Sequence, residues 1–542
     1  MNNDISDTAN ADTLYISNLL EGESILDNLP FDEPQQAEKI LNRFFDALLN
    51  PLLNNETIYA LLEKAAESVA FVTSELAKDY LGQPLTLSES QETSFRSVNM
   101  LWKKMADAYA YCIDSGGRID FQDNVRNHAG ILYRCIHYTG LSILEYQRAR
   151  QEYAPPLLYT LNSYYARAEK AGIDSLIINH PFEPETKTCC AAPYIVICLC
   201  DMVDRHRLSA SEQTLVLRWG ILWAPLITLH KISANNALPP FVLDLTQDRL
   251  FFPSDGNNWN ESLRRMETAR LLSRLRRVEE QLRQQVSPLD LDLGPHCTIG
   301  QCLNLLKRLS RSWSQSKTSR KFRRLFFSRF QPIQLCTGFE EIFFHVSGTP
   351  FEQTRKEKRL YSSDNFEMQF IFRADPTEQD FQVRVGSERN RLAPDSWKLM
   401  DESLTGLRLV TEASKKKITL DQLVAVTPPG ETAFVLGQVV WALQNKERGL
   451  TAGIQLFAGK PLAVAVRFLG NAPNKANIYY PGFLLDACAS LEEEKSLLLP
   501  VRLYRPNARV EFAREDGTVF GQAVLRRIVE SGCDFDRISY SV

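Results

Sequence analysis

The hydrophobic pattern of this chain changes its period once, and that change limits the folds that the chain can adopt. Up to Trp313, apolar residues recur every three to four positions, as in the segment 37–53. Beyond it, β-branched and aromatic residues dominate and often alternate with polar ones. The first spacing gathers apolar side chains on one face of a helix, and the second on one face of a strand. The sequence therefore predicts a helical amino-terminal region followed by a β-rich carboxy-terminal region.

Helices are expected in most of the first 313 residues. The spacing of Ser209 and Glu212 is that of a capping box at a helix start, and Asn260 is expected to cap a long amphipathic helix. The pattern predicts helices at about 40–49, 57–76, 94–113, 194–202, 212–229, 261–286 and 298–313, with one short strand at 241–245.

Strands are expected in most of the remaining chain, where short alternating segments lie between turn residues. The predicted strands are 366–373, 381–385, 407–410, 422–426, 434–442, 452–457 and 463–468, followed by a β-rich segment at 498–526.

Composition and charge favour a globular cytoplasmic protein. Hydrophobic residues make up 44% and charged residues 24%, and the formal net charge of −4 points neither to nucleic acid nor to a membrane. The apolar run Cys189–Cys200 is too short to span a bilayer, and residues 1–28 lack the features of a signal peptide. The eleven cysteines show no framework or zinc-ligand spacing, so we expect free buried thiols, no metal and no cofactor.

A strongly basic stretch lies between Cys302 and Phe339, where nine basic residues occur without an acidic one. A solvated helix face is the plain interpretation, but the interleaved aromatic residues favour a binding surface. Arginine suits a phosphodiester or guanine ligand because its planar fork donates two parallel hydrogen bonds. The nine are Lys307, Arg308, Arg311, Lys317, Arg320, Lys321, Arg323, Arg324 and Arg329.

A second motif, Asp401-Glu-Ser-Leu-Thr-Gly406, follows a strand-like segment. The carboxylate of Asp401 can accept the N1 and N2 hydrogens of guanine, and the Ser403 hydroxyl can serve phosphate or backbone. Gly406 permits a left-handed turn or a close approach of ligand to backbone. A turn between two strands without any ligand is the alternative interpretation.

A third motif has the pattern of a β-hairpin. Gly437-x-Val439-x-Trp441 alternates apolar and polar residues, a charged turn follows at 445–449, and a second strand begins at Gly453-Ile454.

Together the three motifs resemble a PilZ domain. The resemblance rests on Arg320-x-x-x-Arg324, on Asp401-x-Ser403-x-x-Gly406 and on the hairpin, within residues 320–468. It implies a six-stranded antiparallel barrel that binds cyclic di-GMP, with Arg320 and Arg324 on guanine and phosphate. Asp401, Ser403 and Gly406 would then form the cradle on the barrel.

One feature departs from the family pattern, because the stretch from Arg324 to Asp401 is much longer than usual. Either a second β-rich unit is inserted at 336–389, or the binding arginines are others, with Arg323 and Arg329 as the candidates.

With this resemblance, the chain is a multidomain α+β protein in which an α-helical amino-terminal region precedes an antiparallel PilZ-like β-barrel. The helical part could form two bundles. The expected division is a disordered tail at 1–30, a helical region at 31–290, a helix and basic linker at 291–330, a barrel with an insertion at 331–475 and a β-rich extension at 476–542.

The resemblance implies a second-messenger receptor, with cyclic di-GMP as regulatory ligand and an unidentified protein as effector. A ligand-independent adaptor and a nucleic-acid-binding protein that uses residues 307–329 are the alternatives, the latter disfavoured by the near-neutral net charge. No P-loop, nucleophile elbow or metalloprotease motif occurs, so we do not expect an enzyme. Oligomeric state stays open.

Overall fold

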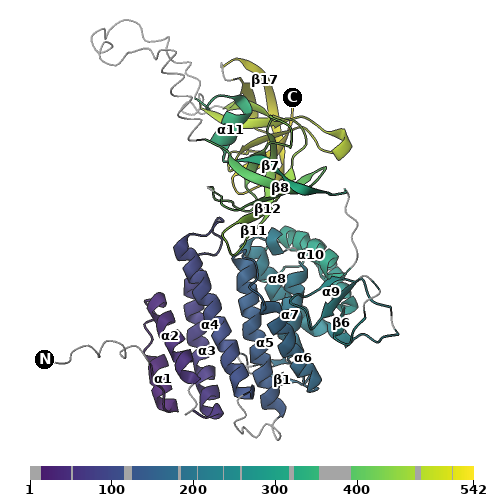
Figure 1. Ribbon diagram of the computed structural model, residues 1–542. Helices are drawn as coiled ribbons and strands as arrows, with labels where there is room; N and C mark the ends of the chain where they lie inside the picture. Colours follow the sequence, from purple (N-terminus) through teal and green to yellow (C-terminus); the bar gives the residue numbers. More distant parts are fainter. Residues whose placement is uncertain are drawn as a thin grey trace, which may run out of the picture. The chain divides into compact units, whose positions relative to one another are not determined.

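The computed structural model divides the chain into two compact units (Figure 1). The amino-terminal unit contains residues 1–83 and 87–319, and the carboxy-terminal unit contains 84–86 and 320–542. The structure describes residues 14–49, 53–114, 125–180, 183, 185–203, 205–235, 237–254, 256, 259–315, 323–352, 392–414, 416–469, 478–514 and 517–542.

The amino-terminal unit is mainly helical, as predicted. Polar side chains fix several helix starts: Asn54 accepts from the backbone N–H of Thr57, and Ser209 and Glu212 form the expected capping box. The helices are α1 (Leu19–Asp27), α2 (Pro34–Leu48), α3 (Asn55–Ala77), α4 (Glu89–Asp114), α5 (Val125–Arg148), α6 (Leu157–Lys170), α7 (Ala191–Met202), α8 (Ala210–Trp223), α9 (Ala269–Arg283) and α10 (Ile299–Trp313).

Small antiparallel sheets accompany these helices. The strands β1 (Ile178–Asn179) and β2 (Lys187–Thr188) pair with each other. A four-stranded sheet has the order β3 (Thr228–Lys231), β6 (Leu263–Glu267), β4 (Phe241–Asp244) and β5 (Phe252–Pro253).

Two of the predicted helices have wrong bounds, and the expected tail contains a helix. The helix expected at 261–286 starts only at Ala269, because residues 263–267 pair with two distant strands. The helix expected at 212–229 ends at Trp223, where Pro225 follows and the chain turns into a short 3-10 helix. The tail expected at 1–30 contains α1, whose Gly22 lies directly against Leu61 of α3.

The carboxy-terminal unit contains two closed six-stranded antiparallel barrels. The first has the order β10-β11-β12-β9-β8-β7, and the second has the order β13-β14-β15-β18-β17-β16. When the strands of each barrel are numbered from one to six along the chain, the first order becomes 4-5-6-3-2-1 and the second becomes 1-2-3-6-5-4. The second order is the first one read in the opposite direction, so each strand has the same two neighbours in both barrels. The two barrels therefore share one topology, although the sequence shows no repeat.

The strands of the first barrel are β7 (Leu325–Thr337), β8 (Asp395–Ser403), β9 (Gly406–Thr411), β10 (Leu423–Val426), β11 (Val435–Gln444) and β12 (Leu450–Leu456), and the helix α11 (Phe339–Ser347) follows β7. Those of the second are β13 (Leu462–Leu469), β14 (Tyr479–Leu485), β15 (Ser496–Pro500), β16 (Arg509–Ala513), β17 (Val519–Ser531) and β18 (Phe535–Ser541).

The boundaries differ from the expected division. One barrel was expected at 331–475, but the second barrel begins within that range, at Leu462, and takes in the expected extension 476–542. The first part of the expected β-rich insertion at 336–389 is the helix α11. The strands predicted at 366–373 and 381–385 lie outside the described residues.

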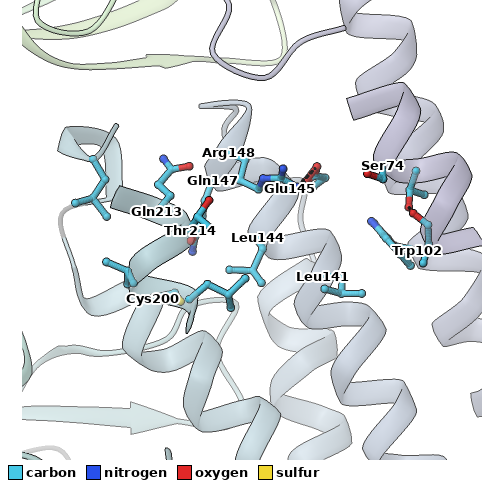
Figure 2. A pocket seen from close by; sticks show the side chains of 15 residues that line it. Ser74, Trp102, Leu141, Leu144, Glu145, Gln147, Arg148, Cys200, Gln213 and Thr214 are labelled. Carbon is cyan, nitrogen blue, oxygen red and sulfur yellow. Dashed lines mark hydrogen bonds and ion pairs between the residues drawn. The ribbon is translucent and has the colours of Figure 1, made fainter. Parts of the chain in front are cut away.

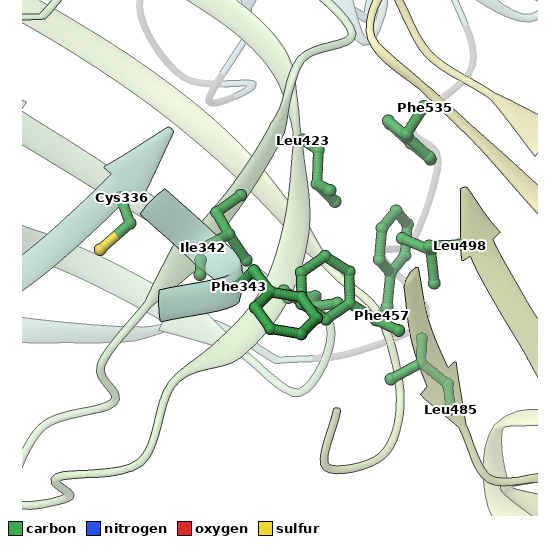
Figure 3. Packing of buried hydrophobic residues seen from close by; sticks show 11 residues of the cluster. Cys336, Ile342, Phe343, Leu423, Phe457, Leu485, Leu498 and Phe535 are labelled. Carbon is green, nitrogen blue, oxygen red and sulfur yellow. The ribbon is translucent and has the colours of Figure 1, made fainter. Parts of the chain in front are cut away.

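A shared apolar cluster joins the two barrels (Figure 3). Ile342 and Phe343 of α11 and Leu423 of β10 pack with Phe483 of β14 and Phe535 of β18, and all five side chains are buried. Burial of several large apolar side chains stabilises such a junction by several kcal/mol, at about 25 cal/mol per Å². The buried cluster therefore holds the first barrel against the second.

Candidate functional site

A buried carboxylate marks the predicted site on the first barrel. The Asp401 side chain is only 2% exposed, and it accepts a hydrogen bond from Nη1 of Arg324. Its second oxygen lies 3.8 Å from Nη1 of Arg408, a contact too long for a hydrogen bond. Two guanidinium groups therefore converge on one carboxylate.

Strand pairing produces this convergence. Asp401 of β8 is the cross-strand partner of Phe326 on β7 and of Arg408 on β9, and Arg408 in turn faces Gly453 on β12. Gly453 is the partner of Trp441 on β11. Directly paired residues project on the same face of a sheet. A transverse row of five residues therefore crosses five strands.

The indole of Trp441 lies across the glycine of this row. A Cβ atom added to Gly453 would be only 1.9 Å from Nε1 of Trp441, so the ring can keep this position only above a glycine. The aromatic surface of Trp441 therefore extends over β12, beside Arg408. The predicted hairpin is confirmed, since β11 and β12 pair around the turn at 445–449.

The predicted Ser403 and Gly406 lie at the tight turn between β8 and β9. They are cross-strand partners, and the Ser403 hydroxyl donates to the Gly406 carbonyl at 3.3 Å. A Cβ on Gly406 would meet the carbonyl oxygen of Ile454 at 3.2 Å, so a larger residue would crowd the neighbouring strand. With no side chain at Gly406, the backbone of the turn near Asp401 is not covered by a side chain of that residue.

The long stretch between the two motifs does not keep them apart. Arg324 directly precedes β7, and β7 pairs with β8, so a residue 77 positions away in sequence meets Asp401. Arg323 and Arg329 are exposed on the same segment. Arg320 lies outside the described residues, so its position stays a prediction.

Sequence reasoning missed Arg408, and it counted Phe326 only as one of the aromatic residues of the basic stretch. Phe326 is 74% exposed, an unusual state for a large apolar side chain. The Nε atom of Arg408 is buried without a hydrogen-bond partner among the described residues. Arg408 could have been predicted from its position in the sequence. It lies two residues after Gly406 on a predicted strand, so the two residues lie on the same face of that strand.

These groups offer a coherent set of contacts to a purine nucleotide. A carboxylate accepts N–H groups, guanidinium groups donate to phosphate or to guanine, and exposed aromatic rings can stack on bases. The rest of the basic stretch is not one free surface, because Arg308 donates to Glu212 at 2.7 Å.

Cavities also lie in the amino-terminal unit. One of about 430 Å³ is lined by Trp102, Leu144, Glu145 and Arg148 among others (Figure 2). Glu145 accepts from the hydroxyl of Tyr80 at 2.8 Å and from Arg148, and burial raises the pKa of its carboxyl group. Sequence reasoning predicted no site here.

A second cavity, of about 870 Å³, has aromatic and polar walls that include Tyr133, His137 and His180. The Tyr133 hydroxyl lies 3.0 Å from Nε2 of His180. Burial lowers the pKa of His137 to about 4, so its imidazole is neutral at pH 7.

The comparisons concern this helical part of the chain. Residues 21–235 match a family model described as "Cyclic-di-GMP receptor FimW, N-terminal domain". This helical region is similar to the amino-terminal domain of a cyclic-di-GMP receptor family. This FimW-like region, residues 21–235, includes the residues that line the two cavities described above, and it ends before the first barrel. No curated protein matches the chain.

No helix among the described residues is long and apolar enough to cross a bilayer. A cytoplasmic location stays a prediction.

Proposed function

We propose that the chain is a receptor for cyclic di-GMP and that its first barrel is a PilZ-type module that binds the ligand. The observation that carries the proposal is the transverse row, in which Asp401 and Arg408 lie between Phe326 and Trp441, together with Arg324, which donates to Asp401. The FimW-like region supports the ligand class from an independent part of the chain.

In this proposal Asp401 recognises the guanine edge, since one carboxylate can accept both the N1 and the N2 hydrogen. Arg408, with an unsatisfied Nε and a long contact to Asp401, is placed to donate to phosphate. Phe326 and Trp441 offer ring faces for the bases. Ser403 and Gly406 leave room for the ligand beside the turn.

Arg324 would act as the moving part. Without ligand its guanidinium neutralises Asp401. When guanine donates its hydrogen bonds to the Asp401 carboxylate, Arg324 leaves this carboxylate and binds a phosphate of the ligand. Arg320, four residues earlier, binds the phosphate together with Arg324. Ordering of a segment by new arginine–phosphate contacts is a known switching mode. The ordered linker would pass the signal to a protein partner.

Calorimetric titration of the full chain with cyclic di-GMP tests this proposal. We expect saturable binding to the wild type. Asp401→Asn keeps the shape of the site but loses the charge, and we expect it to weaken binding about thirtyfold, which corresponds to about 2 kcal/mol. Arg408→Met, at a half-exposed position, should weaken binding about tenfold.

The matched control is Glu511→Gln, which removes a buried carboxylate of the second barrel. We expect unchanged affinity in this variant. Absence of binding to the folded wild type would contradict the proposal, and so would equal losses in Asp401→Asn and Glu511→Gln. A thermal midpoint that no cyclic dinucleotide raises would favour the ligand-independent adaptor, because a ligand selective for the native state must raise stability.

A further inference from the structure

A sulfur, a carboxylate and an imidazole meet where β7 passes into α11. Cys336 is the next-to-last residue of β7, and Glu341 and His345 are four residues apart on α11, on one face of the helix. One ligand atom from each of the three lies within 4.8 Å of the other two. We propose that Cys336, Glu341 and His345 bind one divalent transition-metal ion, with zinc as the natural one.

The local fold holds these residues in place. Cys336 pairs with Ala425 of β10, so the barrel fixes the position of its backbone. Gly338, with φ +80°, then turns the chain directly into α11. The sulfur of Cys336 points away from the phenylalanine rings of the junction (Figure 3). The sulfur lies instead within 4.8 Å of a ligand atom of Glu341 and of one of His345.

The imidazole of His345 has the second contact that metal-binding histidines usually make. Its Nε2 lies 2.7 Å from the carbonyl oxygen of Leu392, to which it can donate. A histidine whose one nitrogen donates to a carbonyl presents the other nitrogen, here Nδ1, as a lone-pair ligand. The ring also contacts Phe344 and Phe434 at centroid distances of 5.2 and 5.1 Å, which limits its rotation.

Charge balance around the cluster suits a divalent cation. Lys416 donates to the Glu341 carboxylate and, at 2.8 Å, to the Ala393 carbonyl. The buried Asp395 accepts from Ser414 at 2.8 Å on the same side. A Cys336 thiolate and the two carboxylates, set against one ammonium, leave two negative charges for an ion to neutralise.

Zinc fits the donor set. Mixed sulfur, nitrogen and oxygen ligands are typical of this ion, and three protein ligands leave a fourth position for water. Binding would replace the thiol proton of Cys336, which leaves to solvent as the sulfur–metal bond forms. An ion here would fix α11 to the first barrel, next to the cluster that joins the two barrels.

Cobalt(II) titration of the full chain provides the test, because a thiolate–cobalt bond gives a near-ultraviolet charge-transfer band. We expect one cobalt ion per chain, and its displacement by zinc. Cys336→Ser should abolish the band, and His345→Gln should weaken cobalt binding at least tenfold, about the loss seen when a metal site is impaired. The control is Cys297→Ser, because the Cys297 and Cys302 sulfurs lie only 3.0 Å apart and form the rival thiol site.

Cys336 is buried, so the test also needs a variant with less risk to folding. In the half-buried His345→Gln, zinc should no longer raise the thermal midpoint, whereas it should raise that of the wild type and of Cys297→Ser. Two results would overturn the site: no charge-transfer band in the wild type, or a band that persists in Cys336→Ser and His345→Gln. Loss of the band in Cys297→Ser alone would assign the metal to the rival pair.

Discussion

The two barrels of the carboxy-terminal unit share one topology but present different surfaces at corresponding strands. In the first barrel, the second and third strands meet in a turn of two residues, with Asp401 and Arg408 beside it. In the second barrel, the connection between β14 and β15 covers residues 486–495, and β15 has no charged residue. The second and third strands of the second barrel, β14 and β15, therefore carry no pair like Asp401 and Arg408.

The buried charges of the second barrel are paired within the barrel. Glu511 accepts from the hydroxyl of Tyr479 at 2.9 Å and forms a 2.8 Å ion pair with Arg467. Asp401, in contrast, is approached by two arginines, Arg324 and Arg408, from two different segments of the chain. The fold alone does not make a site, and the difference lies in which side chains the shared topology brings together.

The largest effect is expected in the second barrel, from Arg467→Met. This change leaves the Glu511 carboxylate, only 4% exposed, without its cation, and a broken buried pair typically costs about 3 kcal/mol. Urea denaturation of the full chain measures the loss, and cyclic di-GMP affinity should not change. The exposed pair of Arg527 and Glu494 gives the control, since Arg527→Met should cost less than about 1 kcal/mol.

An intermediate effect is expected at Gly453 of the first barrel. In Gly453→Ala the added methyl group must displace the indole of Trp441, which should cost about 2 kcal/mol and reduce ligand affinity. The control is Gly521→Ala on β17, where the new Cβ would meet Phe512 at an ordinary 3.6 Å. If both variants bind cyclic di-GMP like the wild type, the row has no role in recognition.

A smaller effect is expected for Asp534, which the second barrel directs toward β10 of the first. Its carboxylate accepts from the backbone N–H of Leu423 at 2.8 Å, yet burial raises the pKa of this carboxyl group. Because the folded pKa exceeds the unfolded one, the stabilisation is present at low pH and is lost as pH rises through the folded pKa.

Asp534→Asn keeps the acceptor for Leu423 but cannot ionise. Its free energy of unfolding should therefore depend less on pH than that of the wild type, with the largest gain at neutral pH. Denaturation midpoints at a pH below the ordinary aspartate pKa of about 4 and at pH 7 measure the difference. A wild type and a variant with equal pH dependence would show that Asp534 has an ordinary pKa.

Sequence reasoning identified the elements whose signal is local. The amphipathic stripes predicted most helices, and the spacing of Asp401, Ser403 and Gly406 identified the turn on which the candidate site is built. It failed where pairing with distant strands determines the secondary structure. Residues 263–267 form a strand because they pair with β3 and β4. The closure of the second barrel is equally non-local, since β13 pairs with β16.

The contacts of the site that sequence reasoning did not foresee have the same physical origin. Arg408 belongs to the site because β9 pairs with β8, and Phe326 because β7 does, although it lies 75 positions before Asp401 in the chain. The proposed metal ligands were missed because Cys336, Glu341 and His345 do not follow a known zinc spacing. Only the turn at Gly338 brings them together.

Hydrogen exchange of the full chain with and without cyclic di-GMP tests the central claim most directly, because it locates the ligand on one barrel. We predict slower exchange of the backbone amides of the β8–β9 turn, around Ser403 and Gly406, and of β12 around Gly453. The corresponding β14–β15 connection at 486–495 should exchange at the same rate with and without ligand. Protection confined to the second barrel, or to the helical unit alone, would contradict the account.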